Sequence, residues 1–512
     1  MRCIFKTSAI VLGFVFFICS DITAQQKLTL AQQQEDFKIF KTSMQEMHAG
    51  LYWFITPQRF NALYDSVYAT LKENEGAEHF YIKVRYCMAA LKHGHDGVEM
   101  TNREPGINYK MNAMPASRKH LPFVLEYLGN KLYILNNCSS NKNIIRGSEI
   151  VSINGKKITD ISKQMLQYIF ANGSNTTFKY KVLGFYFQFN YLYQVLYPDE
   201  TTYRLGIIPY KSKKKMETLV DAELPPTIAD RYQQQTGKSI NTWGKLLDYK
   251  VLDKKTAIGY CKFETFSTQR FDNGSVKLAS ELENIFAAIK KDGIKSLVVD
   301  VRDNEGGDDT WQTAITYFRE IEENKEGGLA YLQSDKFTQI QYIIQNDGNR
   351  QLLQAFQYNP YALIDKTAEG RFKLKPEYTA HDTKGKPLMG NAYSGDVYLL
   401  QNGLTFSAGF AFAAMLKDKI KKSNGFIKVI GEDNADDMDA GVGSGGWSVE
   451  VLLPNSKVKL NIPVTGDGGE KAYTMPPVHF LDYKVIPLIT DKLNNTDTEM
   501  EFVKKLILKK QE

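Results

Sequence analysis

The feature that most constrains the fold is a repeated strand–loop–helix pattern in the C-terminal half of the chain. Residues 296–301 form a nearly continuous apolar run of the kind that is buried on both faces of a parallel sheet. A loop and a helical pattern follow it. The same order recurs at strand 397–400 and helix 407–417, and a third strand spans residues 427–430. Units of this kind predict a parallel α/β layer whose loops gather at one edge.

Two loops of this layer lie at the carboxyl ends of strands, where open α/β sheets carry their sites. In the first, Gly306 and Gly307 free the backbone to point amides outward, as an oxyanion site requires. An ordinary tight turn has the same composition. In the second, Ser407 opens a helix, where a hydroxyl is either an N-cap or a nucleophile with the amide of Ala408 beside it. Neither loop alone decides the chemistry.

The N-terminal half has a different pattern. Apolar residues recur at three- and four-residue steps between residues 28 and 93, which predicts helices. Strand patterns follow from residue 123 to about residue 183, with Asn154 and Gly155 as a tight hairpin turn. The aromatic residues of 185–193 are expected to pack in the core.

The first residues resemble a secretory signal peptide. Arg2 and Lys6 precede an apolar run over residues 8–19, and Ala24 ends the polar stretch after it. The run is shorter than the roughly 20 residues that span a bilayer. We expect residues 1–24 to be removed, which leaves an exported protein, periplasmic or secreted, without a membrane span. A buried helix or an uncleaved anchor is the alternative. A lipid anchor at Cys19 is less favoured, because Ile18 stands where such signals have a small residue.

Composition excludes several classes of protein. A chain of 512 residues suggests about three domains. The formal net charge of +6 comes from scattered lysines, so we expect no nucleic-acid partner. Beyond residue 24 the cysteines are Cys87, Cys138 and Cys261, which form neither a disulfide framework nor a zinc spacing. We interpret them as small buried hydrophobes and expect no metal and no cofactor. A nucleophilic Cys87 is a minor alternative.

The order of these features resembles the serine peptidases of the C-terminal processing peptidase and tricorn-core group. Residues 300–307 are similar to their D-x-R-x-N-x-G-G pattern, residues 397–408 to their nucleophile segment, and residues 147–155 to a string in their PDZ domain. The resemblance covers about residues 40–480. It implies an α/β fold with a crotonase/ClpP-like spiral catalytic core, an N-terminal helical segment and a PDZ-like β-rich domain.

With these landmarks the chain divides into six segments. We expect a signal peptide over 1–24, a helical segment over 25–117, a PDZ-like domain over 118–190, a connecting β-rich and aromatic segment over 191–253, a peptidase core over 254–495, and a C-terminal helix or tail over 496–512.

The same resemblance suggests which base activates Ser407. The Ser–Lys branch of the family has a lysine shortly after a G-E segment, but no lysine follows Gly431 and Glu432 here. The tricorn-like branch uses a histidine after an N-terminal helix, and His95 stands at the matching position, with His93 as the alternate. An imidazole titrates near neutrality, which suits a general base. His48, in an H-x-G-L-Y string, is expected to line the cleft.

The remaining predicted site residues also follow from the resemblance. Glu470, six residues before Pro476, matches the glutamate that orients the histidine. Gly307, Ala408 and Gly306 would form the oxyanion hole. Leu121, Pro122 and Phe123 stand where a PDZ domain has its carboxylate-binding loop, but without its glycines. This departure, and Phe410 where the family often has an acidic residue, weaken the prediction of the substrate more than that of the fold.

The sequence therefore predicts an exported serine endopeptidase that acts on a polypeptide substrate through a serine, a histidine and a glutamate. The alternative is a binding or scaffolding protein that uses its PDZ-type domain and has a degenerate peptidase core. Acyl-CoA chemistry on the same fold is not expected, because an exported protein meets little coenzyme A. The oligomeric state and the cleavage specificity are not indicated by the sequence.

Overall fold

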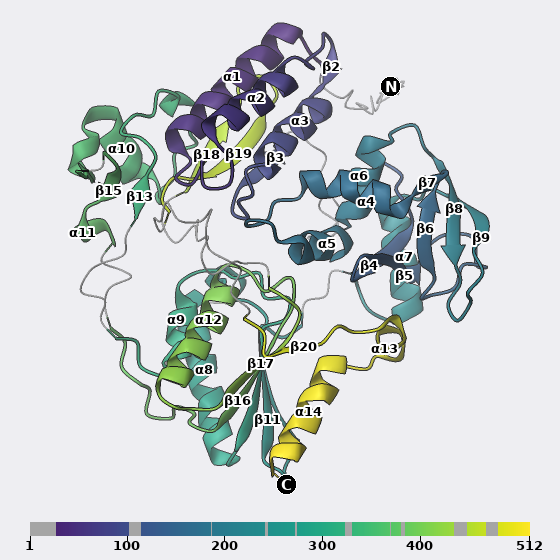
Figure 1. The fold of residues 1–512 in the computed structure, drawn as a ribbon, viewed down its shortest axis with the longest axis vertical. Coiled ribbons are helices and arrows are strands. Elements are labelled where there is room, and N and C mark those ends of the chain that lie inside the picture. Colours follow the sequence, from purple (N-terminus) through teal and green to yellow (C-terminus); the bar gives the residue numbers. More distant parts are fainter. Residues whose placement is uncertain are drawn as a thin grey trace, which may run out of the picture.

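The computed structural model describes residues 27–101, 114–185, 187–240, 244–271, 274–322, 330–368, 370–379, 385–434, 448–466 and 480–511. The predicted signal peptide and Glu470 lie outside the described residues. The described chain is a mixed α/β structure with several sheets, as the sequence predicts (Figure 1).

The predicted parallel layer is a six-stranded sheet of order β10-β11-β12-β16-β17-β20. Strands β11 to β20 run parallel, and β10 pairs antiparallel with β11. The strands are β10 (Leu247–Asp253), β11 (Ile258–Phe263), β12 (Ser296–Asp300), β16 (Asp396–Gln401), β17 (Ile427–Gly431) and β20 (Tyr483–Lys484). The strands predicted at 296–301, 397–400 and 427–430 are therefore confirmed, and β12, β16 and β17 end at a common edge.

Helices cover both faces of this sheet, which explains its apolar strands (Figure 1). On one face lie α8 (Gly274–Lys291), α9 (Thr310–Ile315) and α12 (Ala408–Lys422), and on the other lies α14 (Thr498–Gln511). Because strand side chains alternate, Val299 packs in the first layer together with Phe412, whereas Val298 packs with residues of α14 such as Val503.

The predicted N-terminal helices are α1 (Leu30–Met47), α2 (Pro57–Tyr68) and α3 (Ala77–Ala89). Their apolar faces share a core with a three-stranded sheet of β18 (Ser448–Leu452), β19 (Val458–Pro463) and β3 (Gly97–Met100). A two-stranded ribbon of β1 (Lys27–Leu28) and β2 (Glu75–Gly76) lies beside them. The C-terminal part of the chain thus completes the N-terminal segment, which brings the residues after α3 beside those of β19.

Residues 114–240, the β4–β9 part, form a second large sheet of order β4-β5-β6-β8-β9 with β7 beside β6. Asn154 and Gly155 have φ of 48° and 81°, which fits the predicted hairpin turn. The sheet continues past residue 190, because β8 pairs with β6. Its elements are β4 (Phe123–Leu128), β5 (Lys131–Asn137), β6 (Glu149–Ile153), β7 (Lys156–Lys157), α4 (Ile158–Met165), α5 (Thr176–Phe185), α6 (Gln188–Leu196), β8 (Thr202–Ile208), β9 (Met216–Asp221) and α7 (Pro225–Thr236).

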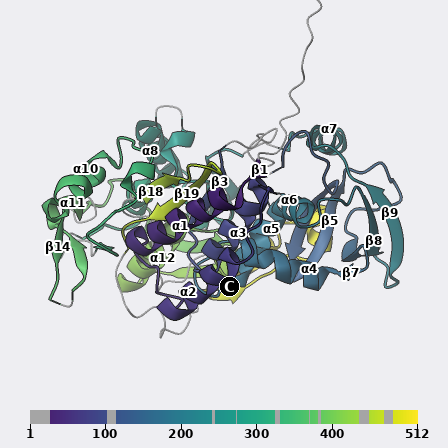
Figure 2. The ribbon, with the colours of Figure 1, turned by 90° about the horizontal axis from the view of Figure 1, so that it is seen from above.

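A small third part contains the sheet β13-β15-β14. It lies at the opposite end of the molecule from the β4–β9 part (Figure 2). Its elements are β13 (Tyr331–Leu332), α10 (Arg350–Tyr358), β14 (Ile364–Lys366), β15 (Phe372–Leu374) and α11 (Pro376–Thr379); helix α13 (Ile489–Asn494) precedes α14.

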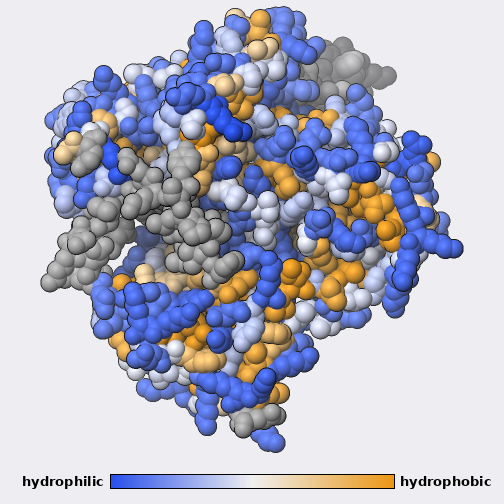
Figure 3. Space-filling model, viewed as in Figure 1, coloured by the Kyte–Doolittle hydropathy of each residue, from blue (hydrophilic) through white to orange (hydrophobic). Residues whose placement is uncertain are grey.

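The surface shown in Figure 3 is largely hydrophilic and carries apolar residues on the β4–β9 part, at its junction with the part below it and on that lower part. Within the described ranges, no helix has the length and hydropathy needed to cross a membrane.

Candidate active site

The structure brings Ser407 and His95 into contact although they are far apart in the sequence. His95 Nε2 lies 3.0 Å from Ser407 Oγ. Ser407 precedes α12 at the carboxyl edge of the sheet, and His95 lies between α3 and β3. Both side chains are half-buried. At this distance an unprotonated Nε2 can accept the hydroxyl proton, as the general base of a serine nucleophile must.

The backbone of Ser407 is strained in a way that exposes its hydroxyl. Its φ and ψ are 52° and −126°, a conformation that residues with a side chain rarely adopt and that costs about 1–3 kcal/mol. Ser407 occupies the N-cap position of α12, but its side chain makes no capping hydrogen bond. The hydroxyl faces His95 instead, so the geometry favours the nucleophile over the N-cap interpretation.

The glycine loop lies directly against this serine. A Cβ added to Gly306 would stand 2.8 Å from both Ser407 Cβ and the Ala408 nitrogen, so a side chain is excluded. Gly307, with φ of 147°, pairs in parallel with Phe266. Among the described residues, no acceptor is found for the amides of Gly307 and Ala408. Both are therefore available to a negatively charged oxygen beside Ser407.

Gly306 has a different role from the one predicted. Its amide donates to Asn304 Oδ1 at 2.8 Å, so it is not free to bind an oxyanion. Asn304 also donates from Nδ2 to the Phe263 carbonyl oxygen at 3.0 Å. The missing side chain of Gly306 thus lets its loop approach Ser407 closely, while the hydrogen bonds of Asn304 hold that loop in place.

The loop over residues 302–308 and the loop that carries Ser407 are tied to each other by reciprocal hydrogen bonds. The Asp303 amide donates to Asn402 Oδ1 at 3.0 Å, and Asn402 Nδ2 donates to Asp303 Oδ1 at 2.7 Å. The amide of Phe406 donates to the Asn304 carbonyl oxygen at 3.0 Å. These bonds set the position of Gly307 relative to Ser407, because each loop holds the other.

The segment that carries His95 is fixed by contacts from three other parts of the chain. Asn172 Oδ1 accepts the amide of Gly94 at 2.6 Å, and Asn461 Nδ2 donates to the His95 carbonyl oxygen at 3.1 Å. The imidazole stacks on the ring of Phe406 with centroids 4.5 Å apart. Since Nε2 faces Ser407, Nδ1 is the nitrogen that an orienting carboxylate would contact.

Two further histidines support this segment from the interior. His48 Nδ1 accepts the amide of Gly50, so its Nε2 carries the proton and donates to Asp96 at 2.8 Å. His93 Nε2 donates to the Gly50 carbonyl oxygen at 2.8 Å. Burial, and secondarily His48, lower the pKa of His93 well below its usual range, which keeps it neutral. His48 is fully buried and does not line an open cleft, contrary to the expectation from its sequence string.

The predicted peptide-binding residues do not face an open groove. The side chains of Leu121, Pro122 and Phe123 are buried, and the Phe123 amide donates to the Leu121 carbonyl oxygen at 3.0 Å. Helix α5 packs directly on β4, since a Cβ added to Gly184 would lie 3.2 Å from Glu126 Cα. A peptide strand would need that space, so the prediction of a carboxylate-binding loop here is not supported.

The three cysteines of the described chain lie in the interior. Cys87, Cys138 and Cys261 are free and buried, as interpreted from the sequence. Burial raises the pKa of the Cys87 thiol far above neutrality, which argues against a cysteine nucleophile. Glu470 lies outside the described residues.

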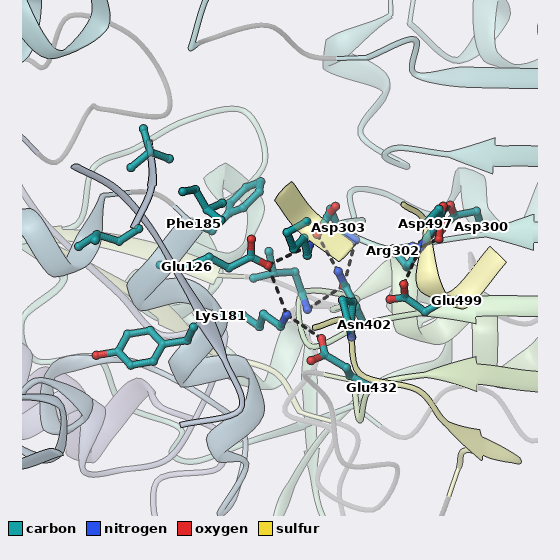
Figure 4. A pocket seen from close by; sticks show the side chains of 18 of the residues that line it. Glu126, Lys181, Phe185, Asp300, Arg302, Asp303, Asn402, Glu432, Asp497 and Glu499 are labelled. Atoms are coloured by element: carbon teal, nitrogen blue, oxygen red, sulfur yellow. Dashed lines mark hydrogen bonds and ion pairs between the residues drawn. The ribbon is translucent and has the colours of Figure 1, made fainter. Parts of the chain in front are cut away.

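A charged cavity that the sequence does not indicate lies behind the two loops (Figure 4). It measures about 470 Å³ and lies between the β4–β9 part, the large sheet and the C-terminal segment. Ion pairs of 2.7 to 2.9 Å cross it: Lys181 with Glu432, Lys492 with Glu126, and Arg302 with both Asp300 and Asp497. The only sequence signal connected with this cavity was the D-x-R pattern, because its two residues, Asp300 and Arg302, line the cavity.

The Asp300–Arg302 pair is expected to make stability depend on pH. Burial raises the pKa of Asp300, but Arg302 and Lys262 outweigh burial and hold that pKa at about 2. A folded pKa below the ordinary 3.8 stabilises the fold above about pH 4, and this contribution is lost as pH falls toward 2. Arg302→Gln would leave a buried carboxylate without its main partner, so we expect a loss of about 3 kcal/mol at pH 7 that shrinks below pH 4.

Urea unfolding of both proteins at pH 7 and pH 3 measures this difference. Arg350→Gln is the matched control, because its ion pair with Asp347 is exposed and should contribute less than about 1 kcal/mol. Equal losses in the two arginine variants, or a loss for Arg302→Gln that does not change with pH, would contradict the prediction.

Comparisons with known proteins concern the fold and the family of the large sheet. Residues 257–438 match the family model described as peptidase family S41. Mature CPAF is similar over 93% of this chain and 96% of its own, with 14% identity and a TM-score of 0.59. CPAF complexed with lactacystin is similar over 93% and 98%, with 14% identity and a TM-score of 0.61. At this identity the likeness shows the shared fold. The comparison with curated proteins gave no match. Residues 257–438 therefore match peptidase family S41, and the chain shares the fold of mature CPAF.

Proposed function

We propose that this protein is an exported serine endopeptidase with Ser407 as nucleophile, His95 as general base and Glu470 as the group that orients His95. The observation that carries the proposal is the 3.0 Å contact between His95 Nε2 and the hydroxyl of a backbone-strained serine beside two available amides. A serine in this setting has what acyl transfer needs: a base, a fixed direction of attack and a place for the developing charge.

The reaction follows from these positions. His95 Nε2 accepts the Ser407 proton as Oγ bonds to the substrate carbonyl carbon. The carbonyl oxygen becomes an oxyanion, which accepts hydrogen bonds from the amides of Gly307 and Ala408. When the C–N bond breaks, His95 returns the proton to the leaving amine. Water then attacks the acyl-enzyme with the same base and the same oxyanion donors. Glu470 would accept from Nδ1–H and stabilise the imidazolium.

The domain assignment is part of the proposal. Within residues 254–495, the large sheet and its helices would form the crotonase/ClpP-like spiral core, whereas β18 and β19 pack with the N-terminal helices. The β4–β9 part would contain the PDZ-like domain expected over 118–190, with α5 packed on β4. Removal of residues 1–24 on export would leave the described chain intact. The scaffold alternative is not favoured, because a protein that had lost catalysis would have no need to keep Ser407 strained and in contact with His95.

Covalent labelling tests the proposal. The full chain is treated with a serine-directed fluorophosphonate probe, and the labelled peptide is identified by mass spectrometry. We expect the label on Ser407, none in Ser407→Ala, and unchanged labelling in Ser423→Ala, where the exchanged serine lies at the other end of α12. A wild-type protein that is folded and takes no label at Ser407 would refute the proposed nucleophile.

A further inference from the structure

A second cavity, of about 320 Å³, lies between the loop after α1, the β13-β15 sheet and the end of the β19 segment. Its walls include four aromatic side chains, Tyr52, Trp53, Tyr331 and Phe372, none of which is buried. The guanidinium of Arg371 stacks on Tyr331 at 3.7 Å from the ring centroid. The mechanism proposed above does not use this cavity.

The cavity lies close to the catalytic histidine. The ring centroid of Trp53 is 6.0 Å from that of His93, and His93 stands two residues before His95, at most about 7 Å along the chain. On the other wall lies Gly466, five residues after Asn461 and therefore at most about 18 Å from it. Asn461 is the residue that donates to the His95 carbonyl oxygen. An extended peptide advances about 3.3 Å per residue. Together with the lengths of the two histidine side chains and the 3.0 Å contact between His95 and Ser407, the first route puts Trp53 at most about 25 Å from Ser407, a distance that an extended peptide covers in about eight residues.

The lining selects among side chains. Aromatic walls favour a large apolar group, because such a group removes apolar surface of both partners from water. Among the described lining residues there is no aspartate or glutamate, so a lysine or arginine would enter without a counter-ion and beside Arg371. The volume accommodates one bulky side chain rather than a folded segment.

Gly466 determines how large that side chain can be. Its backbone pairs with Tyr331 in both directions, at 3.0 and 3.1 Å, which fixes its position. A Cβ added there would meet Ala49 at 3.4 Å and the Trp53 ring at 3.5 Å, both ordinary contacts. An alanine would thus fit without displacing its neighbours, and its methyl group would occupy part of the cavity.

We infer that this cavity is a specificity subsite of the peptidase, which takes a bulky aromatic or aliphatic side chain of the polypeptide substrate within about eight positions of the cleaved bond. This inference rests on the proposed function, since the distance is counted from Ser407 and His95. The cavity would bind a side chain of the substrate that does not take part in the reaction. The binding energy would raise kcat/KM for substrates that carry a bulky apolar residue at that position.

Two variants with different expected effects test the subsite. Fluorogenic peptides carry Phe, Leu, Ala, Glu or Lys in turn at each of about eight positions on either side of one scissile bond. For the wild type we expect one position where Phe and Leu exceed Ala in kcat/KM by about tenfold or more. Phe372→Ala should remove most of that preference. Gly466→Ala should lower kcat/KM for the Phe peptide more than for the Leu peptide, because the added methyl group leaves less room for the larger side chain.

Controls separate this inference from the proposed function. Tyr358→Ala, on α10 of the same part of the chain and 80% exposed, should leave the preference unchanged. Fluorophosphonate labelling of Ser407 should persist in all three variants. Three outcomes would overturn the subsite alone, provided that the wild type is labelled. These are no preference at any position, a preference for Glu, and equal changes of the preference in Phe372→Ala and Gly466→Ala. Absence of label in the wild type would overturn the proposed function and the subsite with it.

Discussion

Replacement of His95 by glutamine is expected to lower kcat for peptide hydrolysis by about 10⁴- to 10⁶-fold. Glutamine retains a polar side chain of similar reach but has no nitrogen that accepts a proton near neutral pH. Ser407 would then attack without a base, and the leaving amine would receive no proton. The residual rate would come from substrate binding and from the amides of Gly307 and Ala408, which this substitution leaves in place.

Steady-state kinetics with one fluorogenic peptide measures the effect, and the rate of fluorophosphonate labelling should fall in parallel. His79→Gln is the matched control, because His79 is an exposed histidine on α3, and its kcat should stay within twofold of the wild type. Activity of His95→Gln within tenfold of the wild type would show that His95 is not the base, and would direct attention to His93.

The second large effect is expected from Gly307→Ala, with a loss of about 10² to 10³-fold in kcat. A methyl group on this residue would overlap the backbone of Phe266 and Ser267, and the φ of 147° is one that alanine avoids. The loop would have to leave its parallel pairing with Phe266, and the Gly307 amide would move away from the position of the oxyanion.

This loss should appear mainly in kcat, because the amide binds a charge that exists only in the transition state. Gly390→Ala is the matched control, since an added Cβ there meets nothing within 4 Å, and we expect unchanged kinetics. A folded Gly307→Ala protein, with a melting temperature close to that of the wild type and full kcat, would contradict the role given to this amide.

The sequence predicted elements well where the pattern is local. The buried strand 296–301, the turn at Asn154 and Gly155 and the N-terminal helices depend on residues that are neighbours in the chain, so periodicity and turn chemistry suffice to find them. The parallel order of β12, β16 and β17 followed from the repeated units, because such connections have few alternatives. The segment boundaries were less accessible, since β8 belongs to the same sheet as β6 across the expected limit at residue 190.

The candidate site depended more on the three-dimensional structure. Family strings indicated Ser407 and His95, but their contact spans 312 positions and needs β19 beside β3 to hold the His95 segment. The use of the Gly306 amide by Asn304 has no sequence signal, because the length and direction of a side chain decide it.

By itself, the sequence determined the α/β layer, the two loops at its carboxyl edge and the residue types that can carry acyl transfer. Local periodicity and short motifs contain that information. Only the tertiary structure decided that a histidine from the N-terminal segment meets the serine, that His48 and His93 are buried supports, and that α5 closes the groove beside β4. These outcomes depend on contacts between residues 43 to 312 positions apart, and no local pattern along the chain specifies such packing.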